Sequence, residues 1–290
     1  MKLQGYLLVF LLAGILSFPA TAHTEQDELL IGLIPEMNVF KQKERFQPLA
    51  DYLSEKTGAK IKLTIFSKYG GIVERFKSLK LDGAFFGSFT GATAIKELGV
   101  EPLARPVNPD GSSTYHGYIF VRKDSGIKNI SNMKGKRMAF VDKATTAGYI
   151  FPMAYFKENG INNIDRYFKE YYFTGSHDAA IYAVLDKKAD IGAAKHSVYD
   201  RVKRSDPRVE KELVILAESP KVPSNGLCVR KDLNKAIKEK LKKALLNIDK
   251  DPKGKVALEK FGALRFIVTT ASDYQPVFDL MKRAEIETKK

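Results

Sequence analysis

The chain has 290 residues, a single cysteine and a formal net charge of +14. One thiol excludes an intrachain disulfide and a cysteine-rich zinc site, and the length allows one large domain or two lobes, each with its own core. A positive balance of this size is compatible with nucleic acid, an anionic membrane surface or small anionic ligands.

The N-terminus has the pattern of a secretory signal peptide. Lys2 precedes an apolar run over residues 6–18, and Ala20-Thr21-Ala22 follows as a small-x-small cleavage site. We predict residues 1–22 as the signal peptide, with cleavage after Ala22. No cysteine follows the apolar run, so a lipid anchor is not expected, and no later segment is long enough to span a membrane. These features predict a soluble periplasmic protein, and export argues against a nucleic-acid partner.

Short apolar runs then alternate with longer amphipathic segments, a pattern typical of α/β proteins. Strands are predicted at residues 29–34, 60–66, 83–86, 137–141, 171–173, 189–193 and 213–217. Helices are predicted at residues 46–58, 71–80, 145–159 and 178–187, and residues 233–290 are expected to be mostly helical. Lysines recur at a helical spacing within residues 230–260, which indicates a solvated helix face.

Two extended stretches, residues 115–122 and 219–229, suggest that the chain crosses twice between two α/β lobes. The first lobe would hold residues 23–115 and 226–290, and the second would hold residues 116–225. The hinge segments would be residues 115–118 and 219–225. This arrangement is typical of a hinged clamp with its ligand in the cleft. A single doubly wound domain is the alternative that periodicity leaves open.

Thr145-Thr146-Ala147 lies where a predicted strand gives way to a helix. The first N–H groups of a helix have no intrahelical partners, and the helix dipole adds partial positive charge there. Two hydroxyls and small side chains at this point could form an oxyanion site made of neutral donors. The alternative is an ordinary N-cap threonine followed by good helix formers.

Four further residues are candidates because of their positions in loops. His177 lies at the start of a predicted helix, where an imidazole could donate to an oxyanion. Tyr69 and Ser88 follow predicted strands, at the edge where α/β sheets usually bind ligands. Asn225 lies in the second extended stretch. For each of them a structural role in a turn or cap is the alternative.

Enzyme signatures are absent from the sequence. There is no nucleotide-binding glycine motif and no G-x-S-x-G nucleophile elbow. His116, His177 and His196 lack the spacing of a zinc protease, so we expect no metal, no cofactor and no catalytic residue.

Several stretches together resemble a known family. DGAFFGS (82–88), NMKGKRMAFVD (132–142), TTAGYIFP (145–152), GSHDAAIYAVLDKKADIGAA (175–194) and SPKVPSN (219–225) occur in the order and spacing of phosphate-, phosphite- and phosphonate-binding (PhnD-like) periplasmic substrate-binding proteins of ABC importers. The resemblance covers nearly the whole chain beyond residue 22. It implies a type II periplasmic binding protein fold, with two α/β lobes that close on the ligand.

The resemblance also implies roles for individual residues. Thr145, Thr146 and the N–H of Ala147 would bind the phosphorus oxyanion together with His177 and the cleft-facing Tyr69. Ser88 would approach from the first lobe, and Asn225 would line the hinge. The third hydroxyl position of the family is Ala147 here, and Phe86 stands where some members have a tyrosine.

The other end of the ligand is where the chain departs from the family pattern. Members that bind an aminoalkylphosphonate place acidic residues against its amine, whereas the matching positions here are Asn225 and Ser197 beside His196. Burying an ammonium without a charge partner is costly, so we predict weak or no selectivity for aminoalkylphosphonates.

The function implied is that of a monomeric periplasmic protein that captures a phosphonate, phosphite or phosphate and delivers it to an ABC permease in the inner membrane. A sensing protein that presents the bound oxyanion to a membrane sensor is the alternative. An enzyme that uses His177 as an acid or base is a third possibility.

Overall fold

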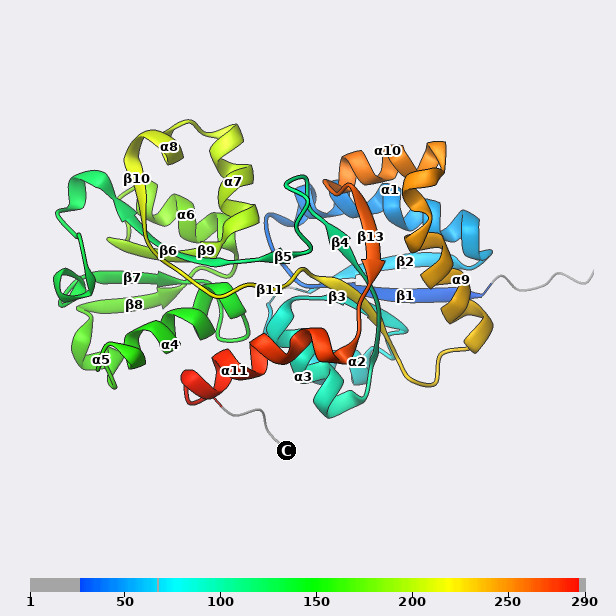
Figure 1. Ribbon diagram of the computed structural model, residues 1–290, viewed down its shortest axis with the longest axis horizontal. Coiled ribbons are helices and arrows are strands. Elements are labelled where there is room, and N and C mark those ends of the chain that lie inside the picture. Colours follow the sequence, from blue (N-terminus) through cyan, green and yellow to red (C-terminus); the bar gives the residue numbers. More distant parts are fainter. Residues whose placement is uncertain (1–26, 67, 287–290) are drawn as a thin grey trace, which may run out of the picture.

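The computed structural model describes residues 27–66 and 68–286. The predicted signal peptide, residues 1–22, therefore lies outside the described residues. The described chain forms two mixed β-sheets, each covered by helices on both faces and placed side by side (Figure 1).

The first sheet has six strands in the order β13-β4-β12-β3-β1-β2. Its strands are β1 (Glu28–Leu33), β2 (Lys60–Ile65), β3 (Gly83–Phe86), β4 (Glu101–Val107), β12 (Gly226–Val229) and β13 (Arg265–Val268). The pairs β1–β2 and β1–β3 are parallel, whereas β12 and β13 pair antiparallel with their neighbours. Alternate side chains of β1 enter two different cores, so both faces of this sheet are buried.

Helices cover the two faces of this first sheet. The residues buried on one face come from α1 (Val39–Thr57), α9 (Lys235–Leu246) and α10 (Pro252–Phe261), and those on the other face come from α2 (Ile72–Ser78) and α3 (Ser88–Leu98). The short 3₁₀ turns η4 (Ile248–Lys250) and η5 (Ala271–Tyr274) connect the later elements.

The second sheet has five strands in the order β10-β6-β9-β7-β8. They are β6 (Gly117–Arg122), β7 (Arg137–Phe140), β8 (Glu170–Phe173), β9 (Ile191–Lys195) and β10 (Leu213–Glu218). Its helices are α4 (Phe151–Glu158) and α5 (Ile164–Tyr167) on one face, and α6 (His177–Leu185), α7 (His196–Ser205) and α8 (Arg208–Glu212) on the other. The 3₁₀ turns η1 (Lys123–Ser125) and η2 (Ile130–Met133) precede β7, and a π-helical turn, η3 (Thr146–Ile150), leads directly into α4.

Two short strands lie between the sheets. The antiparallel pair β5 (Thr114–Tyr115) and β11 (Val222–Pro223) occupies the two stretches where the chain passes from one sheet to the other (Figure 1). Helix α11 (Gln275–Arg283) follows β13 of the first sheet but packs against α3, α4 and η3, so it contacts elements that belong to both sheets. Its buried Val277, Leu280 and Met281 share a core with Ala147 and Ile150.

The observed elements differ from the predicted ones in several places, and helices α3, α5, α7 and α8 lie in segments for which no helix was predicted. Helix α1 begins at Val39, seven residues before the predicted start, because the Asn38 side chain caps it by accepting from the Phe40 N–H at 3.0 Å. The strands β4 and β13 were not among those predicted. β4 carries Pro102 and Pro106, which argue against a strand in the sequence. Pro102 pairs with Cys228 beside a register shift between β4 and β12, and Pro106 pairs with Phe266 of β13.

Candidate functional site

A small cavity lies between the two sheets, where several strands end. We call it the inner cavity; its volume is about 10 Å³, room for about one water molecule. It lies beyond the carboxyl ends of β1, β2, β3, β7, β8 and β9, the edge where α/β sheets usually bind ligands. It is lined by Ile34, Glu36, Tyr69, Gly87, Ser88, Phe89, Tyr115, Ala144, Thr145, Thr146, His177, Lys195 and Asn225. Six of the seven predicted site residues therefore surround one cavity, and Ala147 is absent from its wall.

Two of these residues present hydroxyls that lack hydrogen-bond partners. Tyr69 and Thr146 are both buried, and neither Tyr69 Oη nor Thr146 Oγ1 makes a hydrogen bond of ordinary geometry among the described residues. Thr146 nevertheless lies close enough to Tyr115 to offset part of the rise that burial causes in the pKa of that phenol. Tyr69 follows a strand of the first sheet, whereas Thr146 begins η3 beside the second sheet. Burial raises the pKa of Tyr69 well above its usual value, so this hydroxyl stays a protonated donor. A buried polar group without a partner is costly, which makes this pair a candidate for holding a ligand.

The other residues of the η3 segment have structural contacts. Thr145 Oγ1 donates to the Asp142 carbonyl at 2.6 Å and so closes the turn that precedes η3. Gly148 lies so close to β7 that a Cβ placed there would be 2.4 Å from the Val141 Cβ. A Cβ on Gly117 would similarly be 2.9 Å from the Ala147 Cα. The small residues of this segment therefore allow the helix start to pack tightly against β6 and β7.

His177 is the first residue of α6 and is held in one tautomer. Its Nδ1 accepts from the Lys195 backbone N–H at 3.2 Å, which leaves Nε2 to carry the proton and to act as a donor. Burial lowers the pKa of His177 to about 4, so the ring is neutral near pH 7. The Tyr69 ring lies edge-on to the imidazole at 6.1 Å between centroids.

This neutral histidine gives a prediction for the pH dependence of stability. We expect the free energy of unfolding to fall as the pH drops from 6.5 towards 4, because unfolded His177 gains a proton near its ordinary pKa of 6.5 but folded His177 does so only near 4. The contribution present above pH 6.5 is up to about 3 kcal/mol. His196, whose pKa burial also lowers to about 4, contributes in the same direction.

Urea unfolding at pH 7, 6 and 5 measures this effect. His177→Gln should lose less stability over this range than the wild type. An identical pH dependence in the two proteins would mean that His177 is not a buried neutral group.

Ser88 and Asn225 already have hydrogen-bond partners. Ser88 Oγ donates to the Pro223 carbonyl at 2.7 Å and lies 2.7 Å from Tyr115 Oη. Asn225 Oδ1 accepts from Lys195 Nζ at 3.0 Å. Ser88 thus contacts both short connecting strands, β5 and β11, and Asn225, which follows β11, contacts the end of β9.

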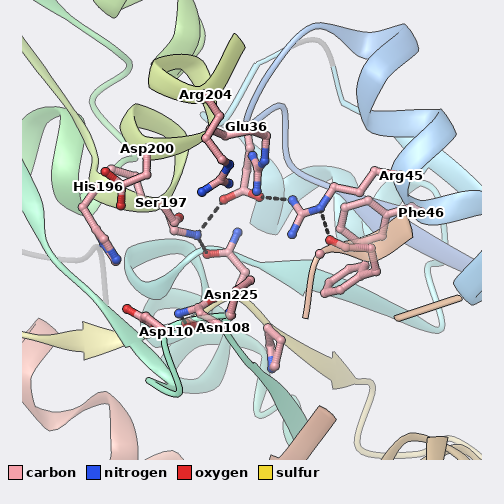
Figure 2. Close-up of a pocket in the computed structure, with 17 residues that line it drawn as sticks. Glu36, Arg45, Phe46, Asn108, Asp110, His196, Ser197, Asp200, Arg204 and Asn225 are labelled. Atoms are coloured by element: carbon pink, nitrogen blue, oxygen red, sulfur yellow. Dashed lines mark hydrogen bonds and ion pairs between the residues drawn. The ribbon is translucent and has the colours of Figure 1, made fainter. Parts of the chain in front are cut away.

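Glu36 and Lys195 form a buried ion pair that the sequence analysis missed. Lys195 Nζ lies 2.8 Å from Glu36 Oε1, and Arg45 Nη1 lies 3.2 Å from Glu36 Oε2 (Figure 2). Lys195 ends β9 of the second sheet, and Glu36 follows β1 of the first sheet, so the pair joins the two sheets across the cleft. The Lys195 ammonium also lies 4.4 Å from the centroid of the Tyr115 ring.

Burial and mutual attraction act in opposite directions on this pair. Burial alone would raise the pKa of the Glu36 carboxyl, but Lys195 and Arg45 more than offset it and hold the pKa below its usual value. Burial lowers the pKa of Lys195, and Glu36 partly restores it. In the sequence, Glu36 and Lys195 are each a single charged residue at the end of an apolar run. This position at a predicted strand end was the only signal that could have marked them as site residues.

Comparison with known proteins identifies the family. Residues 31–274 match the family model described as "ABC transporter, phosphonate, periplasmic substrate-binding protein". The chain belongs to this family. It is accordingly a substrate-binding component of an ABC transporter rather than an enzyme.

Curated relatives agree with this assignment. The phosphonates-binding periplasmic protein of Escherichia coli K12 is 28% identical over 284 residues, which cover 96% of this chain and 83% of that protein. A probable ABC transporter phosphite-binding protein of Prochlorococcus marinus is 24% identical over 92% of this chain and 93% of its own length.

Solved structures show the same fold. A binding-protein component of an ABC phosphonate transporter from Pseudomonas aeruginosa superposes with a TM-score of 0.83 at 23% identity, covering 90% of this chain and 87% of its own. The Prochlorococcus marinus protein PhnD1, solved with methylphosphonate, gives a TM-score of 0.80 at 24% identity, covering 89% and 98% of the two chains. The predicted type II periplasmic binding protein fold with two lobes is thus confirmed. Over the described residues, no helix combines the length and apolar character needed to cross a membrane.

Proposed function

We propose that the protein binds a small phosphorus oxyanion, such as phosphite, phosphate or methylphosphonate, in the inner cavity. The observation that carries this proposal is the pair of buried, unpartnered hydroxyls of Tyr69 and Thr146, which approach one cavity from the two sheets. A phosphoryl oxygen between them would give each hydroxyl a charge-assisted hydrogen bond. The methylphosphonate bound by a solved relative belongs to the same ligand class.

The neutral donors around this cavity support an anionic ligand. The Nε2–H of His177 would donate alongside the two hydroxyls, and the N–H of Ala147 stays a predicted donor from the start of η3. Because Thr145 and Ser88 already use their hydroxyls internally, we assign them to shaping the site. Asn225 would act from the hinge by holding Lys195 in place.

The buried ion pair supports a ligand without an amino tail. Glu36 could attract an ammonium, but the Lys195 ammonium already occupies that position. A ligand ammonium would have to displace Lys195 or lie beside a like charge. The inner cavity is also smaller than a tetrahedral oxyanion, so we expect the lobes or Lys195 to shift when the ligand enters.

The lobes and the partner complete the proposal. The sheets support a first lobe of residues 28–115 and 226–286 and a second of residues 116–225, with hinges at 115–118 and 219–225, beside the β5–β11 pair. A cleaved signal peptide would direct export of the protein. The closed monomer would then deliver its ligand to a permease in the inner membrane. Docking on a membrane sensor is the alternative, but no observation favours it.

Calorimetric titration with phosphate, phosphite, methylphosphonate, 2-aminoethylphosphonate and sulfate tests the proposal. We expect at least one of the first three to bind about tenfold or more tightly than 2-aminoethylphosphonate. In Lys195→Ala, which frees Glu36, the ratio should move towards the amino ligand. If none of the first three binds, or if the wild type prefers 2-aminoethylphosphonate, the proposal is wrong.

A further inference from the structure

A second, larger cavity adjoins the inner one. We call it the outer cavity; its volume is about 140 Å³, and it shares Glu36, Lys195 and Asn225 with the inner cavity as a common wall. Figure 2 shows Glu36 and Asn225 with Arg45 and Phe46 to one side and the α7 residues His196, Ser197 and Asp200 to the other. The donors proposed for the phosphorus oxyanion, Tyr69, Thr146, His177 and Ala147, do not line the outer cavity.

The outer cavity is rich in guanidinium groups. Arg45, Arg201 and Arg204 all line it. Arg45 is already bound, since it pairs with Glu36 and its Nε donates to the Phe261 carbonyl at 2.6 Å. Arg201 Nη1, by contrast, is buried and has no hydrogen-bond partner among the described residues.

The carboxylates nearby do not satisfy these arginines. Glu36 already binds Lys195 and Arg45, so its two oxygens are occupied. Asp110 lines the cavity but accepts from the N–H and hydroxyl of Ser112 at 2.9 and 2.8 Å within its own turn. Asp200 also lines the cavity, but among the described residues it forms no ion pair with Arg201 or Arg204. His196 adds no positive charge near pH 7, because burial lowers its pKa to about 4.

We infer that the outer cavity is an anion subsite that takes a second acidic group, a carboxylate or phosphoryl group, of a ligand whose first phosphoryl group lies in the inner cavity. This inference rests on the proposed function. Arg201 would be the main partner of that second group, because its buried Nη1–H lacks an acceptor and guanidinium groups bind planar carboxylates well. Lys195 lies between the two cavities. It would donate a hydrogen bond to an acidic tail, whereas it would repel a tail that ends in an ammonium group.

A series of ligands with equal chain length tests this inference. 3-Phosphonopropionate, propylphosphonate and 3-aminopropylphosphonate share a three-carbon chain, and their tails end in a carboxylate, a methyl group and an ammonium group. In calorimetric titrations we expect the carboxylate ligand to bind about tenfold or more tightly than propylphosphonate, with one ligand per chain, and the amino ligand to bind more weakly than both. Equal affinities across the series, or two equivalents of propylphosphonate per chain, would overturn the inference.

Variants then locate the subsite. Arg201→Gln should remove the advantage of the carboxylate ligand and leave methylphosphonate affinity within about threefold of the wild type. Lys203→Gln is the matched control, since it removes one positive charge from the same helix at an exposed position paired with Glu210. Equal losses in the two variants would overturn the inference in favour of a long-range charge effect. If the wild type binds methylphosphonate but does not prefer the carboxylate ligand, only this inference is overturned. If it binds none of methylphosphonate, phosphite and phosphate, the proposed function is overturned as well.

Discussion

Thr146→Val and Tyr69→Phe are each expected to weaken binding of the phosphorus oxyanion by about 10- to 150-fold. Each substitution removes one hydroxyl and keeps nearly the same side-chain shape. A hydrogen bond to a charged group contributes about 1.5–3 kcal/mol, which corresponds to this range of dissociation constants. Calorimetry with methylphosphonate measures the effect, and the double variant should show whether the two donors act on the same oxyanion.

The same substitutions should not destabilise the protein without ligand. Both hydroxyls are buried without partners, so removing them relieves a desolvation cost, and the melting temperature of the unliganded variants should be unchanged or higher. Ligand affinity should therefore fall while the melting temperature does not, as expected for groups whose role is to bind a ligand.

Thr93→Val is the matched control for these variants. Thr93 Oγ1 is also buried and unpartnered, but Thr93 does not line the inner cavity. This control should bind methylphosphonate as the wild type does. Wild-type affinity in Thr146→Val and Tyr69→Phe, or an equal loss in Thr93→Val, would contradict the assignment.

Glu36→Gln is expected to be the most destabilising change in the cleft. It leaves two buried cations, Lys195 and Arg45, without a carboxylate, and breaking a buried ion pair in this way costs about 3–5 kcal/mol. Lys195→Met should cost less, because Glu36 keeps its contact with Arg45. Because Glu36 follows a strand of the first sheet and Lys195 ends a strand of the second, part of the loss should appear as opening of the cleft.

Urea unfolding measures the stability loss, and small-angle scattering measures the opening as an increased radius of gyration. The double variant Glu36→Gln/Lys195→Met should recover much of the loss, since removing both partners avoids an isolated charge. Glu210→Gln, which breaks an exposed, solvent-screened pair with Lys203, should leave the free energy of unfolding nearly unchanged. A loss in Glu36→Gln no larger than in Glu210→Gln would show that the buried pair does not hold the lobes together.

The sequence predicted the fold well where local patterns were strong. β3 was predicted at residues 83–86, where it occurs, and β7 and α6 fall within one or two residues of the predicted ranges. β4 was missed because its two prolines argue against a strand, although it pairs with both β12 and β13. β13 was missed because it is a short strand within a segment of mostly helical pattern.

The candidate site was predicted in part. Six predicted residues line the inner cavity because each lies next to a strand end, and strand ends can be inferred from apolar runs. The roles of the small residues near Thr146 could not be inferred in the same way, because Gly117 and Val141, which pack against Ala147 and Gly148, approach only in three dimensions. Glu36 and Lys195 were missed for the same reason, since their pairing spans 159 residues of sequence.

The central claim is that the hydroxyls of Tyr69 and Thr146 hold the phosphorus oxyanion between the two lobes. A crystal structure of the protein with bound methylphosphonate tests it most directly. The claim predicts phosphonate oxygens within hydrogen-bonding distance of Tyr69 Oη, Thr146 Oγ1 and His177 Nε2. A phosphonate group bound only to the arginines of the outer cavity, with both hydroxyls still unpartnered, would contradict it.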